Sequence, residues 1–109
     1  MRHGVPSHEL FAALGHPIRL ALLERLRREP GLPVHLLAGE FAVTRPAISL
    51  HLRVLRDAGL VTEEQHGRER WYAIEGSGFS DASRWLQQYG AFWDDRLAAL
   101  ERRLARRRR

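Results

Sequence analysis

The stretch TRPAISLHLRVLRDAGLV, residues 44–61, decides the fold of this 109-residue chain. Thr44 belongs to the residue types that cap helix N-termini, and Pro46 suits a first helical turn because no N–H is needed there. Apolar residues then recur every three or four positions, which predicts one buried helix face: Ile48, Leu52 and Leu55. Gly59 marks the C-terminal end. We therefore expect a helix over about residues 44–58 whose other side chains face outward.

A second, shorter helix is expected directly before this one. Apolar residues show helical spacing over residues 34–41, and the three residues 42–44 suit a tight turn between helices. Together the two helices predict a helix-turn-helix unit over about residues 34–58. Two further helices are predicted upstream, one around residues 10–14 and one over about residues 17–27.

A β-hairpin is expected after the helix-turn-helix unit. Two β-prone runs, residues 60–65 and 70–74, are joined by a short polar segment that contains Gly67, which predicts a hairpin over about residues 60–75. An α-helix fits the major groove of duplex DNA, and a hairpin beside it can reach the backbone or the minor groove. The order of elements therefore predicts a mostly α-helical winged helix-turn-helix fold with a small β-hairpin, in one domain over residues 1–109.

Polar and basic side chains lie where such a fold would meet DNA. Near the start of the expected helix, Arg45 is placed to pair with guanine, and Thr44 and Ser49 to contact phosphate or a base. Arginines on a helix surface are commonly only solvated, so the order of elements is what favours DNA contact here. The helix contributes Thr44, Arg45, Ala47, Ser49, His51 and Arg53, and the hairpin tip contributes His66, Gly67, Arg68 and Arg70.

Two blocks of the sequence resemble the ArsR-type winged helix-turn-helix repressors: ALGHPIRL at residues 13–20 and the stretch at residues 44–61. The resemblance covers roughly residues 9–75 and implies a sequence-specific, double-stranded DNA-binding repressor. It implies DNA-facing positions for Arg45, Pro46, Ala47, Ser49 and His51, and wing-tip positions for Gly67 and Arg68.

The sequence departs from the family pattern at two positions. Leu50, within the DNA-facing set, stands where a polar or basic residue is common, which weakens a backbone contact or shifts the sequence preference. Ala42 stands where the turn often has glycine, and it would add strain if the turn required a positive φ.

A long amphipathic helix is expected over about residues 78–105. Burying each of its aromatic side chains would contribute on the order of 2 kcal/mol, more apolar area than one small domain easily encloses. A partner surface is therefore expected, and packing into the chain's own core is the alternative. The related family dimerises through its first and last helices, which implies a homodimer interface: Phe11, Leu14, Trp85, Tyr89, Phe92, Trp93, Leu97 and Leu100. A two-fold dimer sets two recognition helices about 34 Å apart and favours an inverted-repeat operator.

The positive charge is concentrated at the C-terminal end. Six of the 18 arginines lie in the last eight positions, and removing these six charges from the net charge of +5 leaves −1. Global charge is therefore weak support for DNA binding, and a local basic surface has to carry the argument. We interpret the arginine tail, residues 106–109, as a frayed and solubilising helix end, with contact to a phosphate backbone as the alternative.

Several function classes are excluded by composition and spacing. The absence of cysteine excludes disulfides, thiolate metal sites and cysteine nucleophiles. No two of the six histidines are three or four positions apart, so no metal site and no cofactor are expected. There is no Gly-rich phosphate loop and no paired carboxylate beside a histidine, so we expect no enzymatic activity. Neither a signal peptide nor an apolar membrane span is recognised, which predicts a cytoplasmic protein without a membrane partner.

Two functional alternatives stay open at this point. A winged helix can serve as a protein-interaction module that does not read DNA bases. A small apolar ligand could bind between the aromatic helix and the first helix, although dimer core explains the same aromatic residues more simply.

Overall fold

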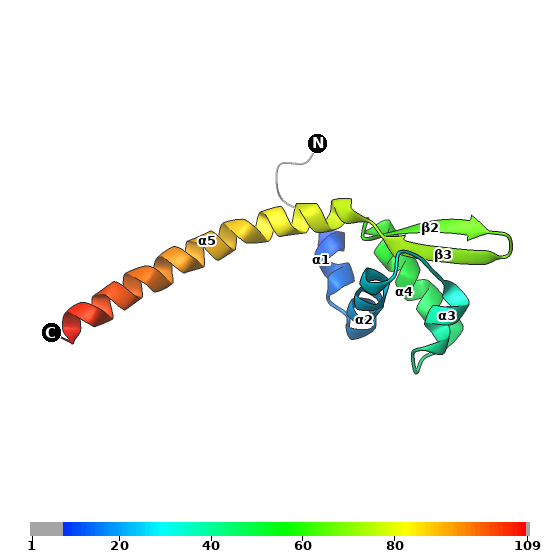
Figure 1. Cartoon of the computed structure of the whole chain (residues 1–109), viewed down its shortest axis with the longest axis horizontal. Helices are drawn as coiled ribbons and strands as arrows, with labels where there is room; N and C mark the ends of the chain where they lie inside the picture. The colour runs from blue at the N-terminus through cyan, green and yellow to red at the C-terminus, as the bar shows by residue number, and fades with distance from the viewer. Residues whose placement is uncertain (1–7, 109) are drawn as a thin grey trace.

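The computed structural model describes residues 8–108; residues 1–7 and Arg109, the last residue of the predicted tail, lie outside the description. The elements in chain order are α1 (His8–Leu14), α2 (Pro17–Arg28), β1 (Leu32–Pro33), α3 (Val34–Gly39), α4 (Arg45–Asp57), β2 (Val61–His66), β3 (Glu69–Ile74) and α5 (Gly76–Arg107). Helices α1 to α4 and the sheet form a body, and α5 extends away from it to give a longest dimension of 70 Å (Figure 1).

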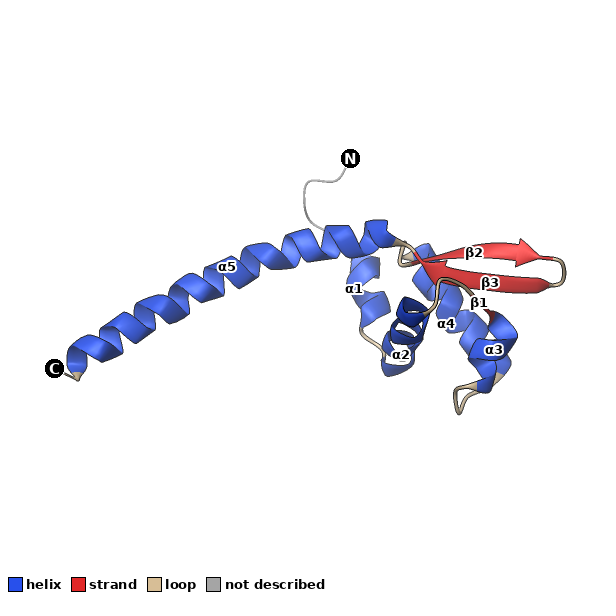
Figure 2. Ribbon diagram, viewed as in Figure 1, coloured by secondary structure: helices blue, strands red, loops and turns tan. Residues whose placement is uncertain are grey.

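One face of each body helix forms the core. The largest side chains that are fully buried are all aliphatic and come from α2, α3, α4 and the segment after α4: Leu22, Leu26, Leu37, Ile48, Leu52, Leu55 and Leu60. Each such side chain stabilises the fold by roughly 1.5–3 kcal/mol when taken out of water. The sheet packs against α2, α3 and α4, so the expected mostly helical fold with a small antiparallel wing is confirmed (Figure 2).

Both ends of α4 are fixed as the sequence predicts. The Thr44 hydroxyl accepts the N–H of Ala47 at 3.3 Å, which caps the N-terminus. At the other end Gly59 adopts φ +78° and donates its N–H to the Arg56 carbonyl at 3.0 Å. The N–H of Leu60 bonds the Leu55 carbonyl, also at 3.0 Å, which completes a Schellman motif. The helix therefore has a defined start, length and exit direction.

The hairpin belongs to a three-stranded sheet with the order β1-β3-β2. The predicted hairpin is confirmed, and its tip is a two-residue turn in which Gly67, at φ +62°, precedes Arg68. A glycine of positive φ at the first turn position is typical of a type II′ turn, which suits the twist of paired strands. Strand β1 was not predicted, because Leu32–Pro33 is too short to show alternation and proline weakens a strand signal.

The turn between α3 and α4 carries no backbone strain. No residue other than glycine has a positive φ within residues 8–108, so the condition under which Ala42 would add strain is not met. Helix α3 ends at Gly39, two residues earlier than expected, and the extra length of the connection lets Ala42 keep an ordinary conformation.

Arg19 ties three helices together. Its guanidinium donates to the carbonyls of Ala12 and Ala13 at the end of α1, at 3.1 and 2.8 Å, and lies 3.2 Å from Nδ1 of His51 on α4. Because a guanidinium only donates, Nδ1 of His51 has to accept, which leaves the imidazole neutral. Partial burial, with the neighbouring His16 and Arg19, lowers the pKa of His51. His16 itself caps α2 by accepting the Ile18 N–H.

Helix α5 does not fold back onto the core. Its seven large apolar residues beyond Trp85 are all exposed: Leu86, Tyr89, Phe92, Trp93, Leu97, Leu100 and Leu104. The helix spans Gly76–Arg107, slightly longer than predicted. Nearer the body, Trp85 contacts the first helix, with its ring centroid 5.2 Å from that of Phe11. The alternative of an intramolecular core for this stripe is therefore wrong.

The start of α5 passes very close to the turn that follows α4. A Cβ added at Gly78 would lie 2.6 Å from the carbonyl oxygen of Gly59 and 3.2 Å from Leu10. The first contact is with backbone, which cannot rotate aside. Glycine at this position therefore allows α5 to start in direct contact with the turn after α4.

We predict that Gly78→Ala destabilises the chain by about 1–3 kcal/mol, the usual cost of overpacking. The matched control is Gly76→Ala, where an added Cβ would meet nothing within 4 Å. The midpoints of urea unfolding of both variants check the prediction. Equal midpoints for the two variants would contradict the close approach.

Candidate nucleic-acid interface

A basic recess lies between α4 and the hairpin. Its volume is about 320 Å³, and five of the predicted DNA-binding residues line it: Arg45, Ser49, Arg53, Arg68 and Arg70. Val34, Gln65 and Tyr72 complete the lining. The fold thus brings four arginines from two separate segments to one surface, and no acidic residue is part of the lining.

The four arginines differ in how strongly they are held. Arg70 lies 3.0 Å from Glu63, and Arg45 lies 3.7 Å from Glu69, a carboxylate that also contacts His35. Within residues 8–108, neither Arg53 nor Arg68 has a carboxylate partner. Two of the four charges are therefore uncompensated and available to an anionic ligand.

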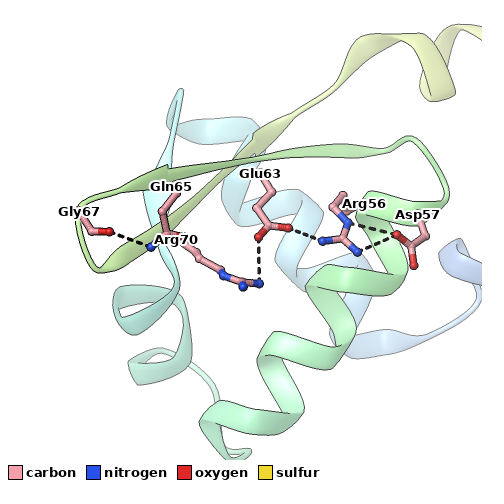
Figure 3. Close-up of polar contacts among 6 residues, drawn as sticks. All are labelled: Arg56, Asp57, Glu63, Gln65, Gly67 and Arg70. Atoms are coloured by element: carbon pink, nitrogen blue, oxygen red, sulfur yellow. Dashed lines mark hydrogen bonds and ion pairs between the residues drawn. The ribbon is translucent and has the colours of Figure 1, made fainter.

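Glu63 joins the hairpin to the end of α4 (Figure 3). Its half-buried side chain forms ion pairs with Arg56 of α4 and Arg70 of β3, and Arg56 also contacts Asp57 at 3.0 Å. Burial, followed by the charge of Glu63, raises the pKa of the adjacent Tyr72 phenol. At the tip, the Gln65 amide donates to the Gly67 carbonyl at 2.9 Å. These contacts hold the hairpin in a fixed position relative to α4.

His66 does not face the recess. Its ring stacks on Trp71 with centroids 5.2 Å apart, and its Nε2 lies 2.7 Å from Glu64. Side chains alternate between the two faces of a strand, so His66 and Glu64 share the face opposite to Gln65. Gly67 and Arg68 form the turn itself, and the exposed Arg68 brings its positive charge to the recess.

Besides Arg45 and Ser49, which line the recess, the predicted residues of α4 and its N-cap fall into three groups. Pro46, Leu50 and Arg53 are exposed on the outer side, and Ala47 is half-buried beside them. The hydroxyl of Thr44 is engaged in the N-cap. His51 lies on the side that faces α2, where Arg19 and His16 contact it, so the structure does not bring it together with the recess.

Glu63, Gln65 and Tyr72 were missed by the sequence reasoning. Strand alternation could have found two of them, since the register pairs Gln65 with Arg70 and Glu63 with Tyr72. The position of Glu63 beside Arg56 could not be found in this way, because it depends on how the hairpin packs on α4.

Among residues 8–108, no group of three or more metal-ligating side chains is gathered in one place. Within the same part of the chain, no helix is long and apolar enough to cross a membrane.

Comparison with known proteins agrees with this architecture. A family model described as a helix-turn-helix domain matches residues 14–64. The transcriptional repressor SmtB of Mycobacterium tuberculosis is 42% identical over 66 residues, which cover 61% of this chain and 48% of the repressor. The chain thus spans about half the length of this relative. SmtB is described as a transcription regulator, which agrees with the expectation that the chain is not an enzyme.

Solved structures extend the match to nearly the whole fold. An ArsR-like transcriptional regulator from Rhodococcus is 37% identical with a TM-score of 0.73, covering 86% of this chain and 85% of that one. The homodimeric winged helix-turn-helix DNA-binding domain of a possible ArsR-family regulator from Mycobacterium bovis is 26% identical with a TM-score of 0.60, covering 76% and 75%. With this sequence identity and this three-dimensional match, the chain belongs to the ArsR family of winged helix-turn-helix transcriptional regulators.

Proposed function

We propose that the chain regulates transcription, most simply as a repressor without a metal site, by binding double-stranded DNA as a homodimer in the cytoplasm. The observation that carries the proposal is the recess of four arginines between α4 and the hairpin, which has no acidic lining residue. Arginine forms strong, often bidentate hydrogen bonds with phosphate oxygens. A surface of this kind suits a polyanion better than an uncharged protein partner.

Different parts of the surface have different roles in this proposal. The outer side of α4 enters the major groove, where Arg45 at the start of the helix pairs with guanine and Ser49 bonds a base or a phosphate. Arg68 at the hairpin tip contacts the backbone or the minor groove. Arg53 and Arg70, at the recess, neutralise phosphates between these two contacts.

The exposed stripe of α5 supports a homodimer. Trp93 is 60% exposed and Leu97 54%, and such large apolar groups in water favour a partner surface. The contact between Phe11 and Trp85 joins α1 to the base of the stripe, so both helices can contribute to one interface. The related Mycobacterium bovis domain is described as homodimeric. A two-fold pairing favours an inverted-repeat operator.

We predict that Arg68→Ala lowers the affinity for all duplexes alike and reduces the slope of log K against log salt by about 1, the effect of one lost phosphate contact. Arg45→Ala should instead relax base preference. Arg28→Ala is the matched control, because it removes the same charge from α2, outside the recess. Fluorescence anisotropy of a labelled duplex at several salt concentrations measures all three.

Two results would contradict this reading of the surface. One is a salt slope that Arg68→Ala leaves unchanged. The other is weak and equal binding of every duplex at physiological salt, which would favour a protein-interaction module instead.

For the dimer, we predict that Leu97→Glu weakens self-association by at least about 100-fold, because an unpaired carboxylate buried on each side costs several kcal/mol. Ala91→Glu is the control, since its helical position lies on the other side of α5 and it introduces the same charge. Sedimentation equilibrium of the full chain measures both. A Leu97→Glu variant that remains dimeric would overturn the proposed interface.

A further inference from the structure

Leu50 is exposed on the outer side of α4, which the proposed function assigns to the major groove, and it lies beside the recess rather than in its lining. Its exposed fraction is 56%, whereas Leu52 and Leu55 of the same helix are fully buried. Helical geometry places it about 160° from Ile48 and from Leu52, on the side away from the core. Leu50 is therefore not part of the core cluster, and more than half of its side chain is open to a partner on the outer side.

The outer side of α4 is apolar in the middle and basic along the edge that faces the recess. Pro46 lies one turn before Leu50 and is also exposed, and Ala47 lies beside them. Arg45 and Arg53 flank this strip toward the recess. A helix that entered the major groove with its cations on phosphates would bring Leu50 against the base edges.

Base edges in the major groove consist mainly of donors and acceptors, and the one alkyl group among them is the C5-methyl group of thymine. An aliphatic side chain pressed on any other base edge would remove water from a polar group without replacing its hydrogen bond, which is costly. Contact with the methyl group instead removes apolar surface of both partners from water.

We infer that Leu50 is a specificity-determining residue of the chain, selecting thymine at one position in each half-site of the operator through contact with the C5-methyl group. The inference rests on the proposed DNA-binding function. It adds to that proposal the identity of one base in each half-site, which the contacts of Arg45 and the hairpin do not determine.

The test compares thymine with deoxyuridine, which lacks only the methyl group and keeps the same hydrogen bonds. A duplex is first selected from a random pool with the full chain, and each thymine in one half-site is then replaced singly by deoxyuridine. We expect about a fourfold loss of affinity at one position per half-site, the value of one buried methyl group. In Leu50→Ala the same replacement should change nothing, so the two changes are coupled in a double-mutant cycle.

Leu20→Ala is the control variant, because Leu20 is a comparably exposed leucine on α2. It should retain the full preference for thymine over deoxyuridine. Since Leu50 is exposed, the unfolding midpoint of Leu50→Ala should equal that of the parent chain, which separates the effect from misfolding.

The possible failures are distinguishable. If a duplex is selected but every deoxyuridine replacement is neutral, or if Leu50→Ala keeps the preference for thymine, the role of Leu50 is wrong and DNA binding stands. Selected half-sites that contain no thymine would likewise contradict the role of Leu50 and leave DNA binding intact. If no duplex is enriched at all, the proposed function itself fails, and the inference fails with it.

Discussion

Burial of one side of α4 is the constraint on which the rest of the structure depends. Ile48, Leu52 and Leu55 are completely enclosed by the body, which holds the helix in one rotational position about its axis. The Thr44 cap and the Gly59 turn fix its two ends. Because the inner side is fixed, the outer side is fixed as well. The position of each outward side chain follows from packing in the core rather than from contacts at the surface.

The hairpin depends on the same helix through one carboxylate. Glu63 contacts Arg56 on α4 and Arg70 on β3, so an acidic residue helps to build a basic surface (Figure 3). Glu63 at the same time compensates part of the positive charge of Arg70. Arg53 and Arg68 keep their full charge within the described residues, and they lie on opposite sides of the recess. The local distribution of charge matters more here than the net charge of +5, which is concentrated in the C-terminal tail.

Much of the fold could be predicted because its signals are local. Helical periodicity, the Thr44 cap and the Gly67 turn all act within a few residues, and the structure confirms the elements they indicate. Strand β1 could not be predicted, because its pairing with β3 joins residues about 40 apart in the chain. The approach of Gly78 to Gly59 was missed for the same reason.

The candidate site shows the same difference between features that local sequence signals indicate and features that depend on tertiary contacts. The structure brings Arg45, Ser49, Arg53, Arg68 and Arg70 to one surface, and their contact with DNA stays a prediction. His51 and His66 have residue types suited to DNA contact, but their side chains contact Arg19 and Trp71 instead. The residue that a histidine side chain contacts depends on tertiary packing. A pattern of residue types along one element does not contain that information.

The most direct test of the central claim is a titration of the isotopically labelled full chain with the duplex it selects, followed by the amide resonances in NMR spectra. The account predicts that the largest shifts fall in residues 45–53 and 65–70, while the buried side of α2 around Leu22 and Leu26 changes little. Shifts confined to α5, or concentrated on α2 with α4 and the hairpin unaffected, would contradict it.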